Sequence, residues 1–351
     1  MTTHAFIFDP LRDPRWPQFL NLHSQASIFH TREWLQALQR TYDYPPVAFT
    51  TSSPGGPLEN AIVFCRVESW LTGSRLVSLP FSDHCQLLVE HRDDWAILVA
   101  EMQQQVAAKK CGYVELRPPI SNQDRLAGLA PFKKSEEYHL HKLDLRPDLR
   151  AIFRNFHESC IQRKIQRAGR ENLTYEAGRS ETTLAKFYHL LLLTRRRHQL
   201  LPQPVAWFRN LIGSLGENLT IHVASKGDQP IASILTLRYK KTIVYKYGAS
   251  DANAHPLGGM PFLFWRAIES AKQWDAQEFD LGRSEVENPG LMKFKERLGA
   301  VGCKVSYLTL CLPRFHSFRK RPRLRLAGGA FARMPDSLAR IAGSVLYKHV
   351  G

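Results

Sequence analysis

The sequence predicts an α/β fold with a mixed sheet, arranged as two domains followed by a basic tail. Helix-period and strand-like segments alternate along most of the chain, which is typical of α/β units rather than of all-α or all-β proteins. The 351 residues suffice for two domains, at roughly 150 residues each. The composition, 44% hydrophobic and 23% charged, is that of a globular protein. It excludes disordered, collagen-like and coiled-coil classes.

The first domain, predicted for residues 1–145, contains a strand–helix–strand series. Strand-like runs lie at 60–67 and 75–79. Residues 92–110 predict a helix, because apolar residues recur near a 3.6-residue period at Trp95, Leu98, Val99, Met102 and Val106. Cys111 and Gly112 end this helix, and residues 113–117 predict a strand before two prolines.

The second domain, predicted for residues 146–312, begins with a basic helix that contains Arg163 and Lys164. Helices are then predicted at 181–197, 205–215 and 261–274, and strands at 219–224, 231–239, 242–247 and 278–283. Both domains place an acid in a short strand after a long helix, Glu115 and Asp280, with an arginine just beyond. This repeated pattern of helix, acid and arginine indicates either an internal duplication or the helix–strand order common to α/β proteins.

The tail, residues 313–351, carries nine Lys or Arg residues and a single acid, Asp336. Pro335, Asp336 and Ser337 predict a helix start, and one apolar face follows at Leu338, Ile341, Ala342, Val345 and Leu346. Two interpretations stay open. The helix docks on the core, or it is a basic amphipathic segment that lies on an anionic membrane.

Charge, cysteine usage and missing motifs narrow the function classes. A formal net charge of +16 and a pI near 9.7 indicate attraction to polyanions. The six cysteines show no disulfide-type spacing, and we expect neither a secretory signal nor a membrane span, which favours a cytoplasmic protein. P-loop, H-E-x-x-H and G-x-S-x-G motifs are missing. His84, Cys85, His139 and His141 lack a second ligand pair, so no metal site is predicted.

Four motifs between residues 242 and 300 carry the functional signal. They read Y-K-Y-G-A-S-D at 245–251, P-F-L-F-W-R-A-I at 261–268, F-D-L-G-R-S at 279–284 and G-L-M-K-F-K-E-R-L-G-A at 290–300. They place polar groups at strand ends, where α/β sheets bind ligands. In this order they resemble the second half of the Fem-type transferases. The chain is similar to the FemAB-like proteins of the GNAT acyltransferase superfamily.

This resemblance implies a tandem pair of GNAT-like domains, 1–145 and 146–312, and transfer of an aminoacyl group from aminoacyl-tRNA to an amine of a peptidoglycan precursor. The lysine that is thought to stabilise developing charge in the family falls on Lys295. The family's phosphate-binding arginine falls on Arg197, with Arg195 and Arg196 as register alternatives. The glycine loop of acyl-CoA-dependent GNAT enzymes is not reproduced at 251–260. The donor therefore stays open among acyl-CoA, acyl carrier protein and aminoacyl-tRNA, and no bound cofactor is expected.

The residues also predict a chemistry of their own. Acyl transfer to an amine needs a neutral amine and a cation or N–H groups near the developing oxyanion. Lys295 is the candidate cation, and Asp280 or Glu285 is the candidate acceptor of the amine proton.

The candidate substrate contacts each have a structural alternative. Arg283 binds an anionic group or pairs with a neighbouring acid, and Ser284 lies beside it. Tyr247 contacts substrate or packs in the core. Arg163 and Lys164 contact donor phosphates or form a solvated face.

The predicted function is an N-acyltransferase that places an acyl or aminoacyl group on an amine of a cell-envelope precursor, in peptidoglycan or exopolysaccharide synthesis. The alternative is a non-catalytic basic adaptor that binds RNA or anionic membrane, motivated by the net charge. A cytoplasmic enzyme held at the inner membrane face by residues 313–351 would combine the two.

Overall fold

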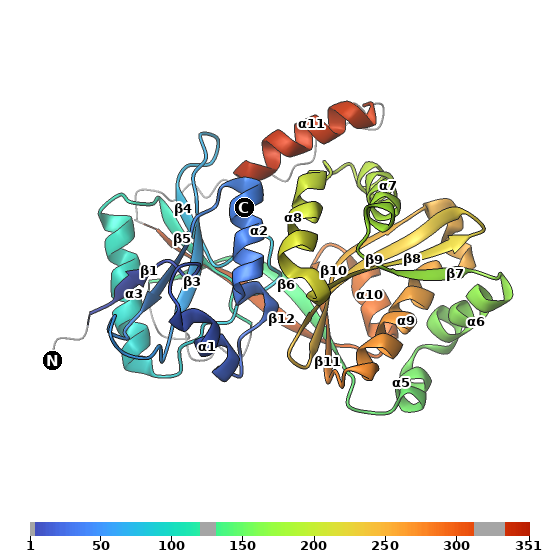
Figure 1. Cartoon of the computed structure of the whole chain (residues 1–351), viewed down its shortest axis with the longest axis horizontal. Helices are drawn as coiled ribbons and strands as arrows, with labels where there is room; N and C mark the ends of the chain where they lie inside the picture. The colour runs from blue at the N-terminus through green and yellow to red at the C-terminus, as the bar shows by residue number, and fades with distance from the viewer. Residues whose placement is uncertain (1–3, 120–130, 312–333) are drawn as a thin grey trace. The chain divides into compact units, whose positions relative to one another are not determined.

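A computed structural model describes residues 4–119, 131–311 and 334–351, which form two compact units (Figure 1). The first unit contains residues 4–119, 131–138, 304–311 and 345–351, and the second contains 139–303 and 334–344. The predicted α/β class with a mixed sheet is confirmed. The predicted boundaries after 145 and 312 stay a prediction. Residues 313–333 of the predicted basic tail lie outside the described residues.

The first unit is a sheet with helices inserted between its strands. The strands are β1 (Phe6–Phe8), β2 (Pro46–Thr50), β3 (Ile62–Val67), β4 (Arg75–Val77) and β5 (Tyr113–Leu116), neighbours in that order. Successive pairs are antiparallel up to β4, and β4 and β5 are parallel. Helices α1 (Arg15–Leu22) and α2 (Arg32–Tyr42), with a short 3-10 helix at Ile28–His30, lie between β1 and β2 in the chain.

Helix α3 (Arg92–Ala107) is the crossover between the parallel strands β4 and β5 and covers the core of the first unit. Trp95, Leu98 and Met102, three of the residues that predicted it, pack in one cluster with Phe64 and Leu76 of the sheet. Beside this core, the buried acid Glu115 accepts a hydrogen bond from Arg117 at 2.8 Å. The acid-and-arginine pattern of the first domain is thus a buried ion pair.

The second unit has the strand order β6-β11-β10-β9-β8-β7. Its strands are β7 (Thr174–Gly178), β8 (Leu219–Lys226), β9 (Gln229–Tyr239), β10 (Thr242–Ser250) and β11 (Glu278–Glu285). The pairs from β7 to β10 are antiparallel, and β10 and β11 are parallel. Strands β6 (Lys133–Asp144) and β12 (Val301–Cys311) contribute residues to both units, and β12 pairs with β5 in the first.

Helices flank this sheet and hold its core. They are α7 (Glu181–Arg197), α8 (Val205–Leu215), α9 (Gly259–Gln273) and α10 (Pro289–Arg297). Leu263, Phe264 and Ile268 of α9 form one cluster with Ile234 and Phe279 of the sheet. The C-terminal helix α11 (Asp336–Leu346) begins where the sequence predicted, and a 3-10 turn at Tyr347–His349 follows it.

The basic helix at the start of the second domain is broken, which corrects the sequence prediction. It forms α5 (Leu149–Asn155), a π-helical turn (Glu158–Gln162) and α6 (Arg163–Arg170). The break falls at Phe156, whose backbone is extended and whose buried ring packs in the core. His157 then starts the next turn, because its Nδ1 accepts a hydrogen bond from the N–H of Cys160 and its own N–H donates to the carbonyl of Arg297.

No helix in the part of the chain that the structure describes is long and apolar enough to cross a membrane.

Candidate active site

The candidate site begins where two parallel strands of the second unit diverge. Strands β10 and β11 pair from Thr242 and Glu278 only as far as Val244 and Asp280, although both continue for five or more residues. In an α/β sheet, this divergence at the carboxyl ends of parallel strands is where ligands enter. The site therefore lies between the ends of β10 and β11.

A β-bulge in β10 shapes its side of the site. The register with β9 shifts between Tyr245 and Tyr247, which places the two tyrosines on opposite faces of the sheet. The Tyr245 ring lies 4.9 Å from Phe264 of α9, whereas the Tyr247 ring lies 5.2 Å from Phe208 of α8. The Tyr247 hydroxyl also accepts a hydrogen bond from the indole of Trp207 at 2.8 Å. These contacts favour the packing interpretation of Tyr247 that the sequence left open.

Lys295 lies at the end of β11. Helix α10 begins at Pro289 and is capped by Asn288, whose side chain accepts a hydrogen bond from the N–H of Leu291. The last turn of α10 carries Lys295. Its side chain is only 2% exposed. The ammonium donates to the carbonyl oxygens of Gly282 at 2.8 Å and Arg283 at 3.1 Å. A buried positive charge thus stands at the carboxyl end of the diverging strand.

The polar residues of β11 lie around this lysine. Asp280 is buried and accepts a hydrogen bond from the N–H of Gly282, which has a φ of +69° and bends the strand. The Ser284 hydroxyl is buried without a hydrogen-bond partner among the described residues. Glu285 is exposed at the end of the strand, and Arg283 is half-buried. The structure therefore brings Lys295 of α10 to the short bend of β11 that carries Asp280, Arg283 and Ser284.

His141 of β6 extends this group and was not predicted as a site residue. It is buried, and its Nε2 lies 3.9 Å from a carboxylate oxygen of Glu296 on α10. Burial lowers the pKa of His141, and the nearby charge of Lys295 lowers it further. The sequence offered only the H-L-H pattern in a strand, which carries no site signal by itself.

A second polar cluster lies at the end of β10. The Arg197 guanidinium donates to the Ser250 carbonyl at 3.3 Å, and the Ser250 hydroxyl lies 2.9 Å from Nε2 of His255. Burial lowers the pKa of His255, and the charges of Arg197 and Lys164 lower it further. We call Arg197, Lys164, Ser250 and His255 the basic cluster.

The basic cluster faces the start of helix α9. Gly258 precedes this helix with a φ of +83°, and a Cβ there would lie 2.3 Å from the backbone oxygen of Lys164. Glycine is therefore required for α6 to pack against the start of α9. Helix N-termini carry partial positive charge, so the helix and the two cations together favour an anion at this end of β10.

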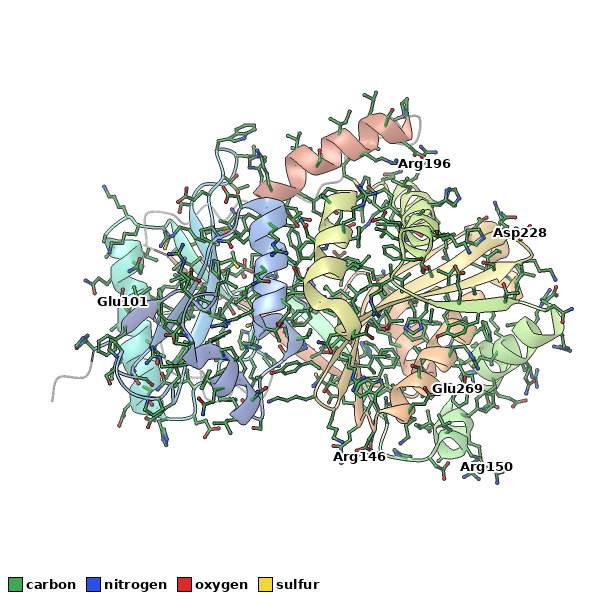
Figure 2. The ribbon with its side chains drawn as sticks, in the orientation of Figure 1. Glu101, Arg146, Arg150, Arg196, Asp228 and Glu269 are labelled. Carbon is green, nitrogen blue, oxygen red and sulfur yellow. The ribbon has the colours of Figure 1, made fainter. Side chains whose placement is uncertain are left out.

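Two other predicted residues lie elsewhere. Arg163 is exposed and pairs with Glu158 at 2.6 Å. Arg196, which is labelled in Figure 2, donates to the Asp336 carboxylate at 2.6 Å and to the Met334 carbonyl. Of the three register alternatives, Arg197 is thus the one that contacts the end of β10. His255 was missed, although it stands in the loop singled out for its unusual sequence.

Comparison with known proteins identifies the second unit. Residues 156–296 match the model of the acetyltransferase (GNAT) domain family. Residues 156–296 therefore form a GNAT acetyltransferase domain. The matched segment runs from the broken basic helix to α10, so it includes β10, β11, the basic cluster and Lys295.

Solved structures show the same fold over most of the chain. FemX has a TM-score of 0.68 at 12% identity, covering 89% of this chain and 98% of that one. A tandem GNAT protein from the clavulanic acid biosynthesis pathway has a TM-score of 0.57 at 11% identity, with 88% and 98% covered. L-PGS from Bacillus licheniformis has a TM-score of 0.54 at 16% identity, with 95% and 96% covered. No curated protein sequence matches the chain.

These comparisons confirm three predictions and leave others as they were. The FemAB-like resemblance is confirmed at the level of the fold, which the chain shares with FemX. The tandem-GNAT fold and the acyltransferase class are confirmed by the GNAT domain and the tandem-GNAT neighbour. The roles assigned to individual site residues stay predictions.

Proposed function

We propose that this acyltransferase moves an acyl or aminoacyl group from a phosphate-bearing donor to an amine of a cell-envelope precursor, in peptidoglycan or exopolysaccharide synthesis. The observation that carries the proposal is the divergence of β10 and β11, with a basic cluster at the end of one strand and a buried ammonium at the end of the other. FemX, whose fold this chain shares, supports the envelope assignment.

The basic cluster is suited to hold the donor. Acyl-CoA, acyl carrier protein and aminoacyl-tRNA all carry phosphate, and Arg197, Lys164 and the N-terminus of α9 offer positive charge and N–H groups for it. Because phosphate is common to the three donors, the cluster accounts for donor binding without choosing among them. The acyl group would then extend between β10 and β11 towards Lys295.

The second cluster is suited to the chemical step. The acceptor nitrogen forms a bond to the acyl carbon, the carbon's bond to the donor oxygen or sulfur then breaks, and the amine loses a proton. A buried cation stabilises the negative oxygen of the tetrahedral intermediate more than it stabilises the neutral carbonyl. In this proposal Lys295 supplies that charge, and Asp280 or Glu285 accepts the proton. Arg283 and Ser284 stay candidate substrate contacts, whereas we expect Tyr247 to serve packing against α8.

Donor binding tests the proposal first. We would compare thermal stabilisation of the purified protein by acetyl-CoA, longer acyl-CoAs, an acylated carrier protein and charged or uncharged tRNA, at two salt concentrations. We expect saturable stabilisation by one donor class and its loss in Arg197→Ala. Arg209→Ala is the matched control, because Arg209 lies on the exposed side of α8, where it pairs with Glu181 of α7.

The outcomes separate the two functions considered. Preference for charged over uncharged tRNA would support aminoacyl transfer, and saturable binding of an acyl-CoA would support a conventional GNAT donor. Equal, salt-labile binding to any RNA with no acyl-donor effect would overturn the proposal and favour the basic adaptor.

The proposed acceptor also implies a location. We place the enzyme in the cytoplasm, with peripheral contact to the inner membrane, since lipid-linked envelope precursors are held there.

A further inference from the structure

Helix α11 rests on the second unit through its smallest residues. Ala339 and Gly343 are buried, one turn apart. A Cβ on Gly343 would lie 2.1 Å from the backbone oxygen of Pro202, in the segment between α7 and α8. The ion pair between Arg196 and Asp336 holds the first turn. The helix is therefore fixed with its small side facing the protein.

This contact turns the large apolar residues of α11 outward. Leu338, Ile341 and Val345 are 53%, 60% and 48% exposed. Their spacing of three and four residues places them in one stripe along the helix. We call these three residues the outer α11 face. The sequence predicted a single apolar face that included them, but a face used for docking on the core would be buried, and this one is not. Clustered exposed apolar side chains indicate an interaction surface.

The charge around the outer α11 face is positive. Asp336, the acid at the start of the helix, is paired with Arg196, whereas Arg340 and Lys348 are exposed. The stretch before the helix in the sequence, residues 312–333, contains seven Lys or Arg and no acid. The complementary partner is therefore anionic. It must also accept aliphatic side chains, which a nucleic-acid backbone does not.

We propose that the outer α11 face docks on an anionic phospholipid bilayer. Leu338, Ile341 and Val345 enter the boundary between headgroups and acyl chains, and the exposed Arg340 and Lys348 attract the acidic headgroups. Neither force suffices alone, because three side chains bury little area and charges are screened by salt. The inference concerns a surface outside the acyl-transfer site and stands without the proposed function.

The first unit carries exposed apolar side chains of its own. The residues that follow α11 contact the loop between β3 and β4, where the Thr72 hydroxyl donates to the His349 carbonyl at 2.9 Å and the Trp70 ring lies 5.2 Å from the His349 ring. Trp70 is 80% exposed, and Leu71 beside it is 39% exposed. Exposed tryptophan is the residue most typical of a membrane–water interface.

Vesicle co-sedimentation of the full chain tests the proposal, using vesicles of phosphatidylcholine alone or with added phosphatidylglycerol. We expect binding only to the acidic vesicles, weakened by salt. The triple variant Leu338→Asn, Ile341→Asn and Val345→Asn should lower the partition coefficient about tenfold or more. The matched control is Leu22→Asn with Val301→Asn, since these aliphatic residues are 80% and 76% exposed elsewhere and should not matter.

Three results would overturn the proposal. Wild-type protein that ignores acidic vesicles would refute it directly. A triple variant that binds as well as wild type would show that charge acts without the outer α11 face. Light scattering that detects a dimer in the wild type and a monomer in the triple variant, with neither bound to vesicles, would assign the face to a second copy of the chain. Donor stabilisation, measured without lipid, separates these outcomes from failure of the proposed function.

Discussion

At the scale of single residues, the buried charge of Lys295 is the feature that most needs an explanation. Burying an ammonium is costly unless its N–H groups are satisfied, and here two carbonyl oxygens of β11 accept from it. The same contacts fix the bend at Gly282 and Arg283. The lysine therefore has a structural task in addition to the chemical one we propose.

Replacement of Lys295 by methionine separates these tasks. The variant keeps the side-chain length but leaves the Gly282 and Arg283 oxygens without this donor, so we expect a loss of about 2–3 kcal/mol in the free energy of unfolding. We also expect kcat to fall about 10²–10³-fold. Urea denaturation and single-turnover rates measure the two effects. Lys293→Met is the control, because Lys293 is exposed on the same helix. Unchanged turnover in K295M would refute the proposed role.

A second residue-scale prediction concerns Tyr247. Tyr247→Phe removes the acceptor of the buried Trp207 indole N–H, which should cost about 1–3 kcal/mol. KM for donor and acceptor should stay near the wild-type values, because the ring packs against α8. Thermal unfolding and steady-state kinetics check both statements. A raised KM with unchanged stability would restore the substrate-contact interpretation.

The sequence located these residues better than it described their surroundings. The resemblance of the F-K-x-x-x-G motif to the Fem family made Lys295 a candidate, but the contacts of Lys295 depend on how α10 packs on β11, which no local pattern encodes. The bulge between Tyr245 and Tyr247 is likewise invisible in a Y-x-Y pattern, which by strand period would place both rings on one face. His255 was missed because a single loop histidine resembles many surface histidines.

At the scale of elements, the start of helix α9 connects the basic cluster to the sheet. It depends on close contact between the backbone of α6 and Gly258. The approach is possible only while residue 258 has no side chain. Donor binding and local stability should therefore respond together to a change at this position.

Gly258→Ala should be strongly destabilising. The new Cβ would meet the Lys164 oxygen at 2.3 Å with the backbone held at positive φ, so we expect a loss of about 2 kcal/mol or more and weaker donor binding. Gly227→Ala is the control: its φ is +57° but nothing lies within 4 Å. It should cost only about 1 kcal/mol and leave donor binding unchanged. Equal effects of the two variants in chemical denaturation would contradict the steric argument.

Long amphipathic elements were predicted well and irregular ones poorly. The helix predicted at 181–197 has the bounds of α7, and the one at 92–110 differs from α3 only at its end. The π-turn between α5 and α6 was missed because the apolar residues in and around it, Phe156, Ile161 and Ile165, indicate one continuous helical stripe. Strand β7 was missed because it is short and none of its side chains is buried, so no apolar alternation marks it. Strand β6 was also missed. Most of its second half alternates between buried and partly exposed side chains, but its first half is mostly charged.

At the scale of the whole molecule, each unit contains a buried neutral histidine. In the first unit, His30 accepts at Nδ1 from the N–H of Ser27 and lies 3.0 Å from the Gln86 carbonyl at Nε2. In the second unit, His222 lies 2.9 Å from the hydroxyls of both Tyr175 and Thr236. Burial lowers the pKa of each histidine to about 4.

Stability should therefore fall on acidification. Between about pH 6.5 and pH 4 these histidines bind protons in the unfolded chain but not in the folded chain. Their contribution to the free energy of unfolding is therefore fully present above about pH 6.5 and is lost as the pH falls towards 4. Each histidine contributes about 3 kcal/mol to the loss. Denaturant titrations from pH 7.5 to 4.5 measure it. His222→Gln should flatten the profile, and the exposed control His189→Gln should not. A profile unchanged by H222Q would contradict the assignment.

Fold class was the level at which sequence alone did best, since alternating helices and strands together with four ordered motifs sufficed. The pairing of β12 with β5 was not predictable, because the residue pattern of a strand does not indicate which sequence-distant strand it pairs with.

That pairing also has a consequence during protein synthesis. Leu116 of β5 meets its partner Leu308 only after 192 further residues have been translated. At about 5–20 residues per second, the nascent β5 waits roughly 10–40 s with an open strand edge. The order in which the ribosome delivers the strands thus leaves the first unit incomplete until almost the whole second unit has emerged. During that interval, protection of the edge falls to chaperones rather than to the fold.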